Sequence, residues 1–309
     1  MRTPPIVRGS AVPPGARGLL HLVHQMVEAG GTDLHLKVPG RPMIRVNGAL
    51  LPMPFDRLTP ADTAAFAQGV LEVAGSDELA TSPRDVRLAF SVDGVGRFRA
   101  QLTRQRGSCE IVIHRIALAP PTMAEFPGLA PLGEVLDGGP GLFLVGGGRH
   151  RRAVIAAVVG AFNARCWGRL VSIEDPVEWL HRDERGSLSQ REIGTDVSTF
   201  AEGLSAAMRQ DADAVVVSDV PTADDADALL RASEEGLLVF AGLPVADPDD
   251  AVLALAGRFA PGREREVSAR IASVLRGVVV VDHAGEVSWK RIDAGRRAAL
   301  RAGQLSLVG

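Results

Sequence analysis

The chain has 309 residues and a formal net charge of −3, and 46% of its residues are hydrophobic and 23% charged. This composition is ordinary for a globular protein and excludes a chain that is disordered throughout. The balanced charge excludes a broadly basic nucleic-acid-binding protein, and two cysteines cannot form a disulfide framework. No apolar run approaches the ~18 residues of a membrane helix, so we expect a cytoplasmic protein. The length of the chain predicts two compact domains.

The N-terminal part of the chain mixes helical and strand-like patterns. Residues 1–18 are rich in Pro and Gly and predict a flexible leader. Helical spacing follows in two segments, 18–29 and 59–74. Strand-like patterns follow in three segments, 32–50, 86–102 and 110–116. Thr59 is in position to cap the second of these helices. Strand pairs interrupted by helices predict a small α+β domain over 19–118.

A second pattern begins after a Pro-rich stretch, 119–137, which we interpret as a linker. In 138–309, short and wholly apolar runs alternate with helical stretches, and the runs are 141–145, 170–173, 214–217 and 237–240. Strands buried on both faces that alternate with helices predict a mostly parallel α/β sheet. Ligands of such sheets bind at the carboxyl ends of the strands, so we expect the functional site there.

Several short segments have recognisable sequences: TDLHL at 32–36, PMIRVNG at 42–48, GRFR at 96–99, IEDPVE at 173–178, QREIG at 190–194 and MRQDADA at 208–214. In this order and spacing, 19–305 resembles the retraction ATPases of bacterial type IV pili, the PilT-type branch of the secretion-ATPase superfamily. The resemblance implies a PAS-like N-terminal domain and a RecA-like domain with the P-loop NTPase fold. It also implies a hexameric ring at the cytoplasmic face of a pilus machine that drives twitching motility.

The expected phosphate-binding loop departs from the motif G-x-x-x-x-G-K-[ST], and its glycines are Gly146, Gly147 and Gly148. Aligned on the flanking strand and helix, the loop is about two residues shorter than the motif. Arg151 then takes the position of the Lys, and Arg152 that of the Ser or Thr that binds Mg²⁺. Arginine carries a positive charge to a phosphate but cannot ligate Mg²⁺. Two interpretations stay open: an unusual anion site at a helix N-terminus, or a basic surface loop.

Other positions that handle nucleotide in the family also differ. The resemblance implies a Glu after the run 214–217 that polarises the attacking water, and this chain has Asp219, which is one methylene shorter. Two histidines of the family are replaced by Leu237 and Pro244. The family's acidic segment persists, and by resemblance Glu174 would face the Mg²⁺–water region. The alternative is that this segment forms a turn whose Glu174 and Glu178 pair with arginines.

Three arginines of the N-terminal domain are candidates for a role at a neighbour's nucleotide. By resemblance, Arg97, Arg99 and Arg115 would act as charge-stabilising fingers in the ring. The alternative is that these strand arginines keep an exposed sheet edge soluble. No metal-binding cluster of protein ligands is expected.

We interpret the chain as a degenerate PilT-type homologue, a pseudoenzyme that serves a type IV pilus or related machine as a structural or regulatory subunit. No cofactor is then required. The alternative is a weak ATPase that drives retraction, binds ATP and Mg²⁺ through its non-standard loop, and uses Glu174 and Asp219 in catalysis. Expected partners are further copies, an active pilus ATPase in a mixed ring, and inner-membrane platform proteins that recruit the chain to the membrane. The family continues for several helices beyond the last residue here, so we expect a C-terminally truncated RecA-like domain.

Overall fold

The computed structural model describes residues 15–75, 85–116, 119–136, 139–148 and 150–304. The chain divides into two compact units, Met1–Leu118 and Ala119–Gly309, and each has its own hydrophobic core. In the described ranges, no helix is long and apolar enough to cross a membrane. Most of the predicted leader lies outside the described residues, but its last part is helical, since the first helix begins at Gly15.

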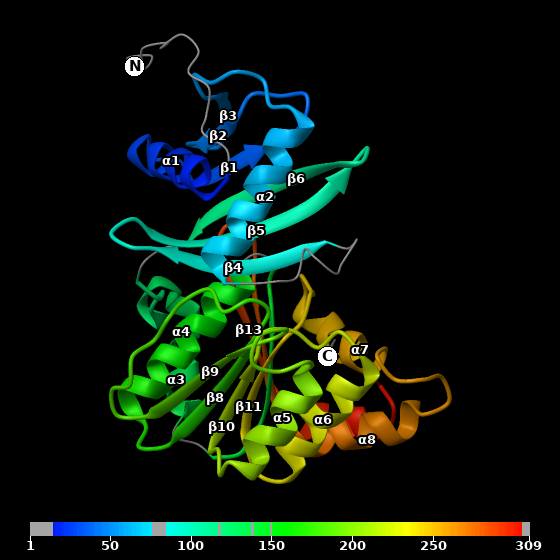
Figure 1. Cartoon of the computed structure of the whole chain (residues 1–309). Coiled ribbons are helices and arrows are strands. Elements are labelled where there is room, and N and C mark those ends of the chain that lie inside the picture. The colour runs from blue at the N-terminus through cyan, green and yellow to red at the C-terminus, as the bar shows by residue number, and fades with distance from the viewer. Residues whose placement is uncertain (1–14, 76–84, 117–118, 137–138, 149, 305–309) are drawn as a thin grey trace. The chain divides into compact units, whose positions relative to one another are not determined.

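The first unit is an antiparallel sheet of six strands in the order β3-β2-β1-β6-β5-β4. The strands are β1 (Asp33–Leu36), β2 (Met43–Val46), β3 (Ala49–Pro52), β4 (Val86–Val92), β5 (Gly96–Gln105) and β6 (Ser108–Ile116). Helices α1 (Gly15–Glu28) and α2 (Pro60–Ala74) pack on one face of this sheet (Figure 1). The predicted α+β character of this part of the chain is confirmed.

Sequence patterns explain this unit well. Leu34 and Leu36 are fully buried while their neighbours are half-buried, as expected of a strand with one covered face. The Thr59 side chain caps α2 by accepting a hydrogen bond from the Asp62 backbone N–H, and Gly75 ends the helix in the left-handed region with φ of 67°. Strand β3 was not predicted, because all four of its residues are exposed and show no alternation.

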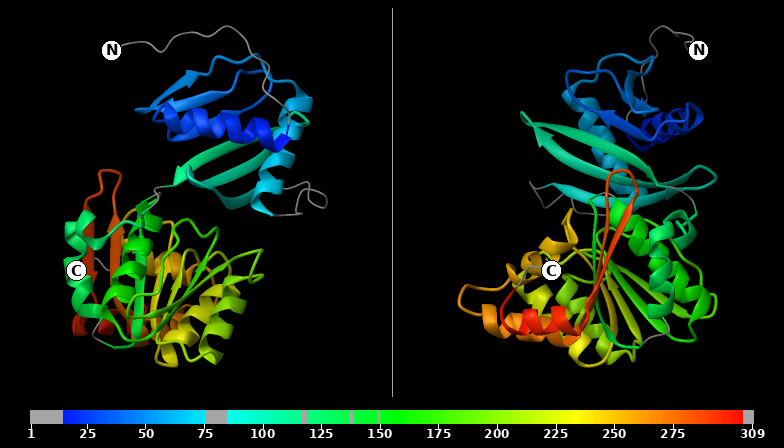
Figure 2. Two further views of the ribbon diagram at one scale, coloured as in Figure 1. Left: turned by 60° about the vertical axis from the view of Figure 1, so that its left-hand side comes forward. Right: turned by 180° about the vertical axis from the view of Figure 1, so that it is seen from behind.

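The second unit is a sheet of seven strands in the order β13-β12-β7-β11-β10-β8-β9. All neighbouring pairs are parallel except β12 and β13, which form an antiparallel hairpin at one edge of the sheet (Figure 2). The strands are β7 (Gly141–Gly146), β8 (Arg169–Glu174), β9 (Ser187–Glu192), β10 (Ala214–Val217), β11 (Leu238–Gly242), β12 (Leu275–Val281) and β13 (Val287–Arg291). The predicted mostly parallel sheet is confirmed.

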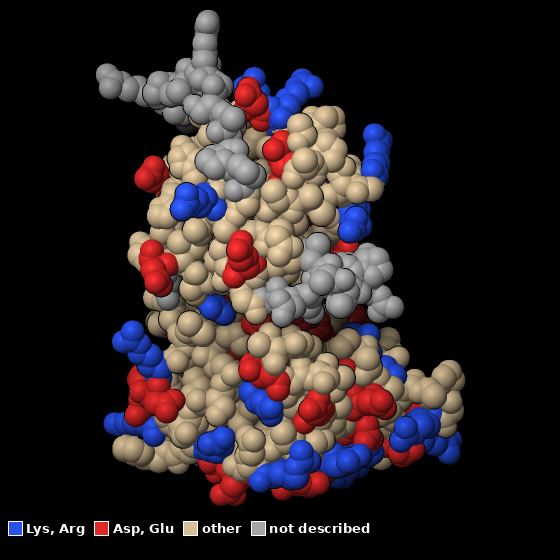
Figure 3. All heavy atoms as spheres, viewed as in Figure 1, with Lys and Arg blue, Asp and Glu red and all other residues tan. Residues whose placement is uncertain are grey.

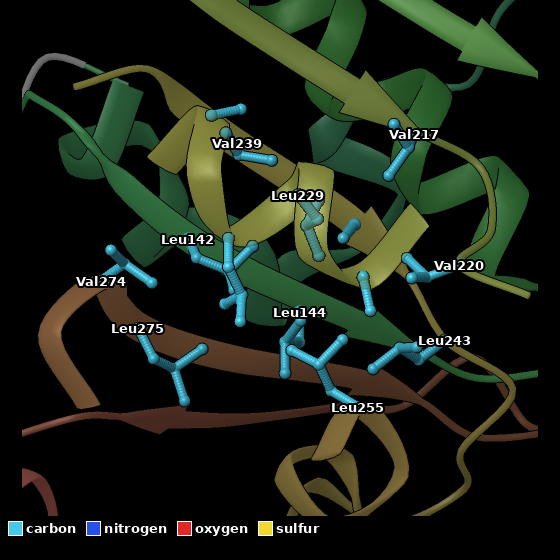
Figure 4. Packing of buried hydrophobic residues seen from close by; sticks show 14 of the residues in the cluster. Leu142, Leu144, Val217, Val220, Leu229, Val239, Leu243, Leu255, Val274 and Leu275 are labelled. Carbon is cyan, nitrogen blue, oxygen red and sulfur yellow. The ribbon is translucent and has the colours of Figure 1, made fainter. Parts of the chain in front are cut away.

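Helices cover both faces of this sheet (Figure 1). Those of the described residues are η2 (Met123–Glu125), η3 (Pro127–Leu129), α3 (Ala130–Leu136), α4 (His150–Arg165), α5 (Phe200–Arg209), α6 (Ala223–Glu234), η4 (Pro248–Asp250), α7 (Ala251–Ala256), α8 (Glu264–Val274) and α9 (Ala294–Arg301). Helices α3 and α4 pack on one face, and α5, α6, α7 and α8 on the other. Figure 4 shows Leu229 of α6 among the sheet residues Leu142, Val217 and Val239. Because β7, β10 and β11 are buried on both sides, their sequences are continuous apolar runs.

The segment 119–137 is not the linker that its Pro content suggested. Its described residues belong to the second unit and form η2, η3 and α3. Leu129, Leu132 and Leu136 are buried against the sheet face that α4 also covers. The apolar residues between the prolines therefore pack as part of the core, and the boundary between the two units falls near residue 118.

Strands β9, β12 and β13 were not predicted, and β9 and β13 were missed for a common reason. They are the two terminal strands of the sheet, and most of their residues are only half-buried. Sequences such as SLSQRE and VSWKR therefore lack the apolar run that identifies a central strand. On the face seen in Figure 3, basic and acidic side chains are interspersed, in agreement with the balanced net charge.

Asp225 ties together the starts of two helices. Its carboxylate accepts hydrogen bonds from the Thr222 backbone N–H at 3.2 Å and hydroxyl at 2.5 Å, which caps α6, and from the Ala201 N–H at 2.9 Å at the start of α5. Asp225→Ala would leave these donors without an acceptor at a buried position, because Asp225 is only 3% exposed. We expect it to lower the free energy of unfolding by about 2 kcal/mol.

The matched control is Asp62→Ala, which removes the equivalent carboxylate from the more exposed capping box of α2. It should cost only about 1 kcal/mol. Urea denaturation followed by circular dichroism measures both. Equal losses in the two variants would contradict a tie between α5 and α6.

Candidate functional site

The candidate site lies where four neighbouring parallel strands, β7, β11, β10 and β8, end at one edge of the second unit's sheet. The segments that follow these strands bring together most of the residues singled out in the sequence. They are Gly146 at the end of β7, Gly147, Gly148, Arg151 and Arg152 after it, Glu174 at the end of β8, and Asp219 after β10. The expectation that these segments meet at one edge is therefore fulfilled by the fold.

The loop between β7 and α4 is drawn tightly against the neighbouring strands. The Gly147 N–H donates to the Val245 carbonyl at 2.8 Å, and the Gly147 carbonyl accepts from the N–H groups of His150 and Arg151 at 3.0 and 3.1 Å. Gly147 has φ of +122°, and a Cβ there would lie 2.2 Å from the Val281 carbonyl oxygen, so only glycine fits. These three N–H groups are thereby bound to protein carbonyls and are not directed at an anion.

Arg151, at the motif's Lys position, points into the protein. Its side chain is 8% exposed, and its Nη2 lies 3.3 Å from Oδ2 of Asp219. Burial lowers the pKa of Arg151, and the negative charge of Asp219 opposes that shift. Since arginine does not lose its proton in proteins, a buried positive charge here requires the carboxylate beside it.

Arg152 makes a second set of internal contacts. Its Nη1 donates to Oε1 of the buried Glu178 at 2.6 Å, and its Nη2 donates to the Asp175 carbonyl at 2.7 Å. The Asp175 N–H in turn donates to the hydroxyl of Ser218 at 3.0 Å. These bonds join the start of α4 to the segments that follow β8 and β10.

Glu174 is buried and has a different environment. Its Oε1 accepts hydrogen bonds from the Ser172 hydroxyl at 2.8 Å and from Nε2 of Gln190 at 3.2 Å. Burial raises the pKa of Glu174, and the negative charge of Glu178 adds to the rise. The interpretation in which both glutamates pair with arginines therefore holds for Glu178, while Glu174 has neutral hydrogen-bond partners.

The three arginine-finger candidates lie in the first unit and do not share one sheet face. Arg97 and Arg99 alternate with the buried Phe98 on β5, so they lie on the face opposite the helices. Arg115 on β6 pairs across the sheet with Phe98 and therefore lies on the helix side. The Nη1 of Arg97 donates to the Ser91 hydroxyl at 3.2 Å.

Sequence reasoning missed several polar partners. Gln190 bridges three groups, because its Nε2 also donates to the Trp179 carbonyl and its Oε1 accepts from the His181 N–H. Glu192 accepts from the Val177 N–H at 2.9 Å. Both residues belong to the QREIG segment, which had been singled out without a role. Its position after the acidic segment was the available indication that the two meet.

A magnesium nucleotide is the ligand that the family resemblance implies at this edge, and the residues do not fit it as they are arranged. Arg152 has no oxygen for Mg²⁺, and its guanidinium is bonded to Glu178 and Asp175. Arg151 is paired with Asp219 rather than directed at the loop. Arg151 and Arg152 are instead each engaged in an ion pair within the protein.

The pKa of Glu174 predicts a pH dependence of stability. Because the folded protein holds this proton more tightly than the unfolded chain, stability is lost as the pH rises above the group's ordinary pKa of 4.5. Glu174→Gln keeps both acceptor bonds but carries no charge. We expect it to gain stability relative to the parent as the pH rises from acid to neutral, by about 1.4 kcal/mol for each unit of pKa elevation.

Thermal unfolding across this pH range measures the difference between the two proteins. Glu178→Gln is the matched control, and it should be less stable than the parent at neutral pH because it breaks the pair with Arg152. A constant difference between Glu174→Gln and the parent from acid to neutral pH would show that the pKa of Glu174 does not change on folding, and would contradict this prediction.

Comparison with known proteins identifies the family. A profile of the family described as Type II/IV secretion system protein matches residues 129–279. The Type IV pilus ATPase PilU of Pseudomonas aeruginosa is 28% identical over 84% of this chain and 68% of its own length. The uncharacterized protein YggR of Escherichia coli is 32% identical over 84% of this chain and 78% of its own.

A solved structure agrees with this result. The crystal structure of the pilus retraction motor PilT with bound ADP has a TM-score of 0.78 and 27% identity, and the match covers 93% of this chain and 86% of that one. The similarity spans both units. The chain belongs to the PilT/PilU-type family of type IV pilus ATPases, among the type II/IV secretion system proteins.

Proposed function

We propose that this chain is a non-hydrolysing member of its family, a structural or regulatory subunit of a type IV pilus or a related motility or secretion machine. The observation that carries the proposal is the ion pair between Arg151 and Asp219 at 3.3 Å. These residues stand at the family's positions for the phosphate-binding Lys and the water-polarising Glu. An arginine and an aspartate that are paired with each other interact less strongly with a phosphate or a water molecule than unpaired charges do.

Three further features support the loss of nucleotide handling. The Mg²⁺-binding hydroxyl is replaced by Arg152, whose guanidinium is held by Glu178 at 2.6 Å. The loop is short, and the Gly147 N–H that could face a phosphate donates to Val245 instead. Pro244 stands where the family has a histidine, and it supplies neither a side-chain donor nor an N–H.

The domain assignment follows from the same family. We assign a PAS-like domain to 19–118 and a RecA-like domain to the residues from 138 onward, with the helical segment before β7 as part of the second domain. The chain requires neither ATP nor Mg²⁺ to fold in this proposal, because internal ion pairs balance the charges that a magnesium nucleotide would otherwise meet.

Partners are proposed by analogy with the family. A chain that keeps the fold of the family but does not hydrolyse ATP is suited to a role in which other proteins bind it. We propose self-association or a mixed ring with an active pilus ATPase, at the cytoplasmic face of the inner membrane and in contact with pilus platform proteins. The sheet face of the first unit that carries Arg97 and Arg99 is the expected contact surface, because α1 and α2 cover the opposite face.

A hydrolysis assay tests the first part of the proposal. The purified chain should release phosphate from ATP with Mg²⁺ no faster than buffer, while an active PilT-type relative in the same assay is the positive control. Turnover of about 1 s⁻¹, which Asp219→Asn abolishes, would overturn the proposal and establish a weak ATPase. A variant with a full G-x-x-x-x-G-K-S loop in place of 146–152 should bind ATP by calorimetry without hydrolysing it, because Asp219 and Pro244 remain.

Sedimentation velocity tests the second part. The chain, alone or mixed with an active homologue, should form assemblies in nucleotide-free buffer through an interface of more than ~1,000 Å². Arg99→Glu should weaken the assembly, whereas Arg265→Glu, an equal charge change on the exposed face of α8, should not. A strict monomer, both alone and in the mixture with the active homologue, would contradict this role.

A further inference from the structure

The second unit contains a pocket at the opposite end of the sheet from the candidate site. It has a volume of about 240 Å³ and opens near the amino end of β7, between α3, the β12–β13 hairpin and α9. The residues that matter for its chemistry are two aromatic and four charged residues, namely Phe143, Trp289, Arg276, Arg291, Arg297 and Glu134.

Local backbone features place Arg276 at this pocket. The pairing of β12 with β7 shifts register between Leu275 and Gly277, so Arg276 is the extra residue of a bulge. A bulge redirects the side chain of such a residue. The Arg276 side chain lies over Gly141, where a Cβ would come within 2.4 Å of its Cγ, so the arginine can lie here only because residue 141 is glycine.

The hairpin contributes the floor and a second arginine. Arg291 pairs with Gly277 across the antiparallel strands, and Trp289 pairs with Val279, so both side chains lie on one face. The Trp289 ring extends over Gly277, where a Cβ would lie 2.8 Å from it, and stacks on Phe143 with centroids 6.0 Å apart and planes at 13°. The result is a rigid aromatic floor beside cationic side chains.

Within the described part of the chain, the positive charges of this pocket are not balanced by carboxylates. Among the described residues, Arg276 and Arg291 make no side-chain hydrogen bond or ion pair, and Arg297 reaches only the Ile292 carbonyl at 3.5 Å. Elsewhere in the unit, basic residues such as Arg270 and Lys290 are paired with carboxylates. Glu134 is the one acidic side chain among the described lining residues, against three arginines.

We propose that this pocket binds a small oligophosphate, either free or carried by a nucleotide. Guanidinium groups bind phosphate oxygens in a bidentate manner, and several of them on one pocket wall suit an anion with more than one phosphate. The volume is below that of pockets for drug-sized ligands, so the ligand is small or only partly enclosed. This inference does not depend on whether the chain hydrolyses ATP at the other edge of the sheet.

Calorimetry with magnesium-free pyrophosphate and ADP in low-salt buffer tests the proposal on the full chain. We expect saturable binding of pyrophosphate with one site per chain. Arg291→Ala and Arg276→Ala should each weaken it about tenfold or more, because each removes a charge-assisted contact to phosphate. Arg265→Ala, which removes an exposed arginine of α8 that does not line the pocket, should bind as the parent does.

The two ligands distinguish the two sources of phosphate. Equal affinity for ADP and pyrophosphate would indicate a free oligophosphate, and tighter binding of ADP would indicate that the aromatic floor contacts the base; both support the site. Unchanged melting temperatures of the variants exclude a folding defect. The absence of saturable binding by the parent chain, or parent-like affinity in both Arg291→Ala and Arg276→Ala, would overturn the proposal.

Discussion

A buried guanidinium must have a carboxylate beside it, and this requirement organises the edge of the second unit's sheet at which β7, β8 and β10 end. Arg151 is almost fully buried at the start of α4, and Asp219 is the carboxylate that its charge contacts. The two positions are therefore coupled: loss of the aspartate would leave a buried positive charge without compensation. The glycine loop before α4, which closes on the Val245 carbonyl, keeps Arg151 in this position.

The two ends of the same sheet differ in how their charges are balanced. At the carboxyl end, Arg151 and Arg152 are each paired with a carboxylate, so little net charge is left to attract an anion. At the amino end, Arg276 and Arg291 line a pocket without such partners among the described residues. If the chain binds phosphate, charge balance favours the amino end, which differs from where the family resemblance alone would place it.

The sequence predicted the features that depend on local pattern and on topology. The caps of α2 and the central strands β7, β8, β10 and β11 followed from residue type and periodicity, and the placement of Arg151 and Asp219 at one edge followed from the common edge at which parallel strands end. The direction of side chains was not predictable. The sequence therefore did not indicate that Arg152 pairs with Glu178 and not with Glu174. The edge strands and the pocket at Arg276 were missed because they depend on partial burial and on a bulge.

Arg151 and Asp219 should be energetically coupled, and a double-mutant cycle measures this coupling directly. Arg151→Met, Asp219→Asn and the double variant are compared with the parent by urea denaturation at neutral pH. We expect a coupling free energy of about 1–3 kcal/mol, with the double variant more stable than the sum of the single losses implies. Losses that add within about 0.3 kcal/mol would contradict this expectation, because they would mean that the two charges do not stabilise each other. Arg151 would then be available to bind a ligand.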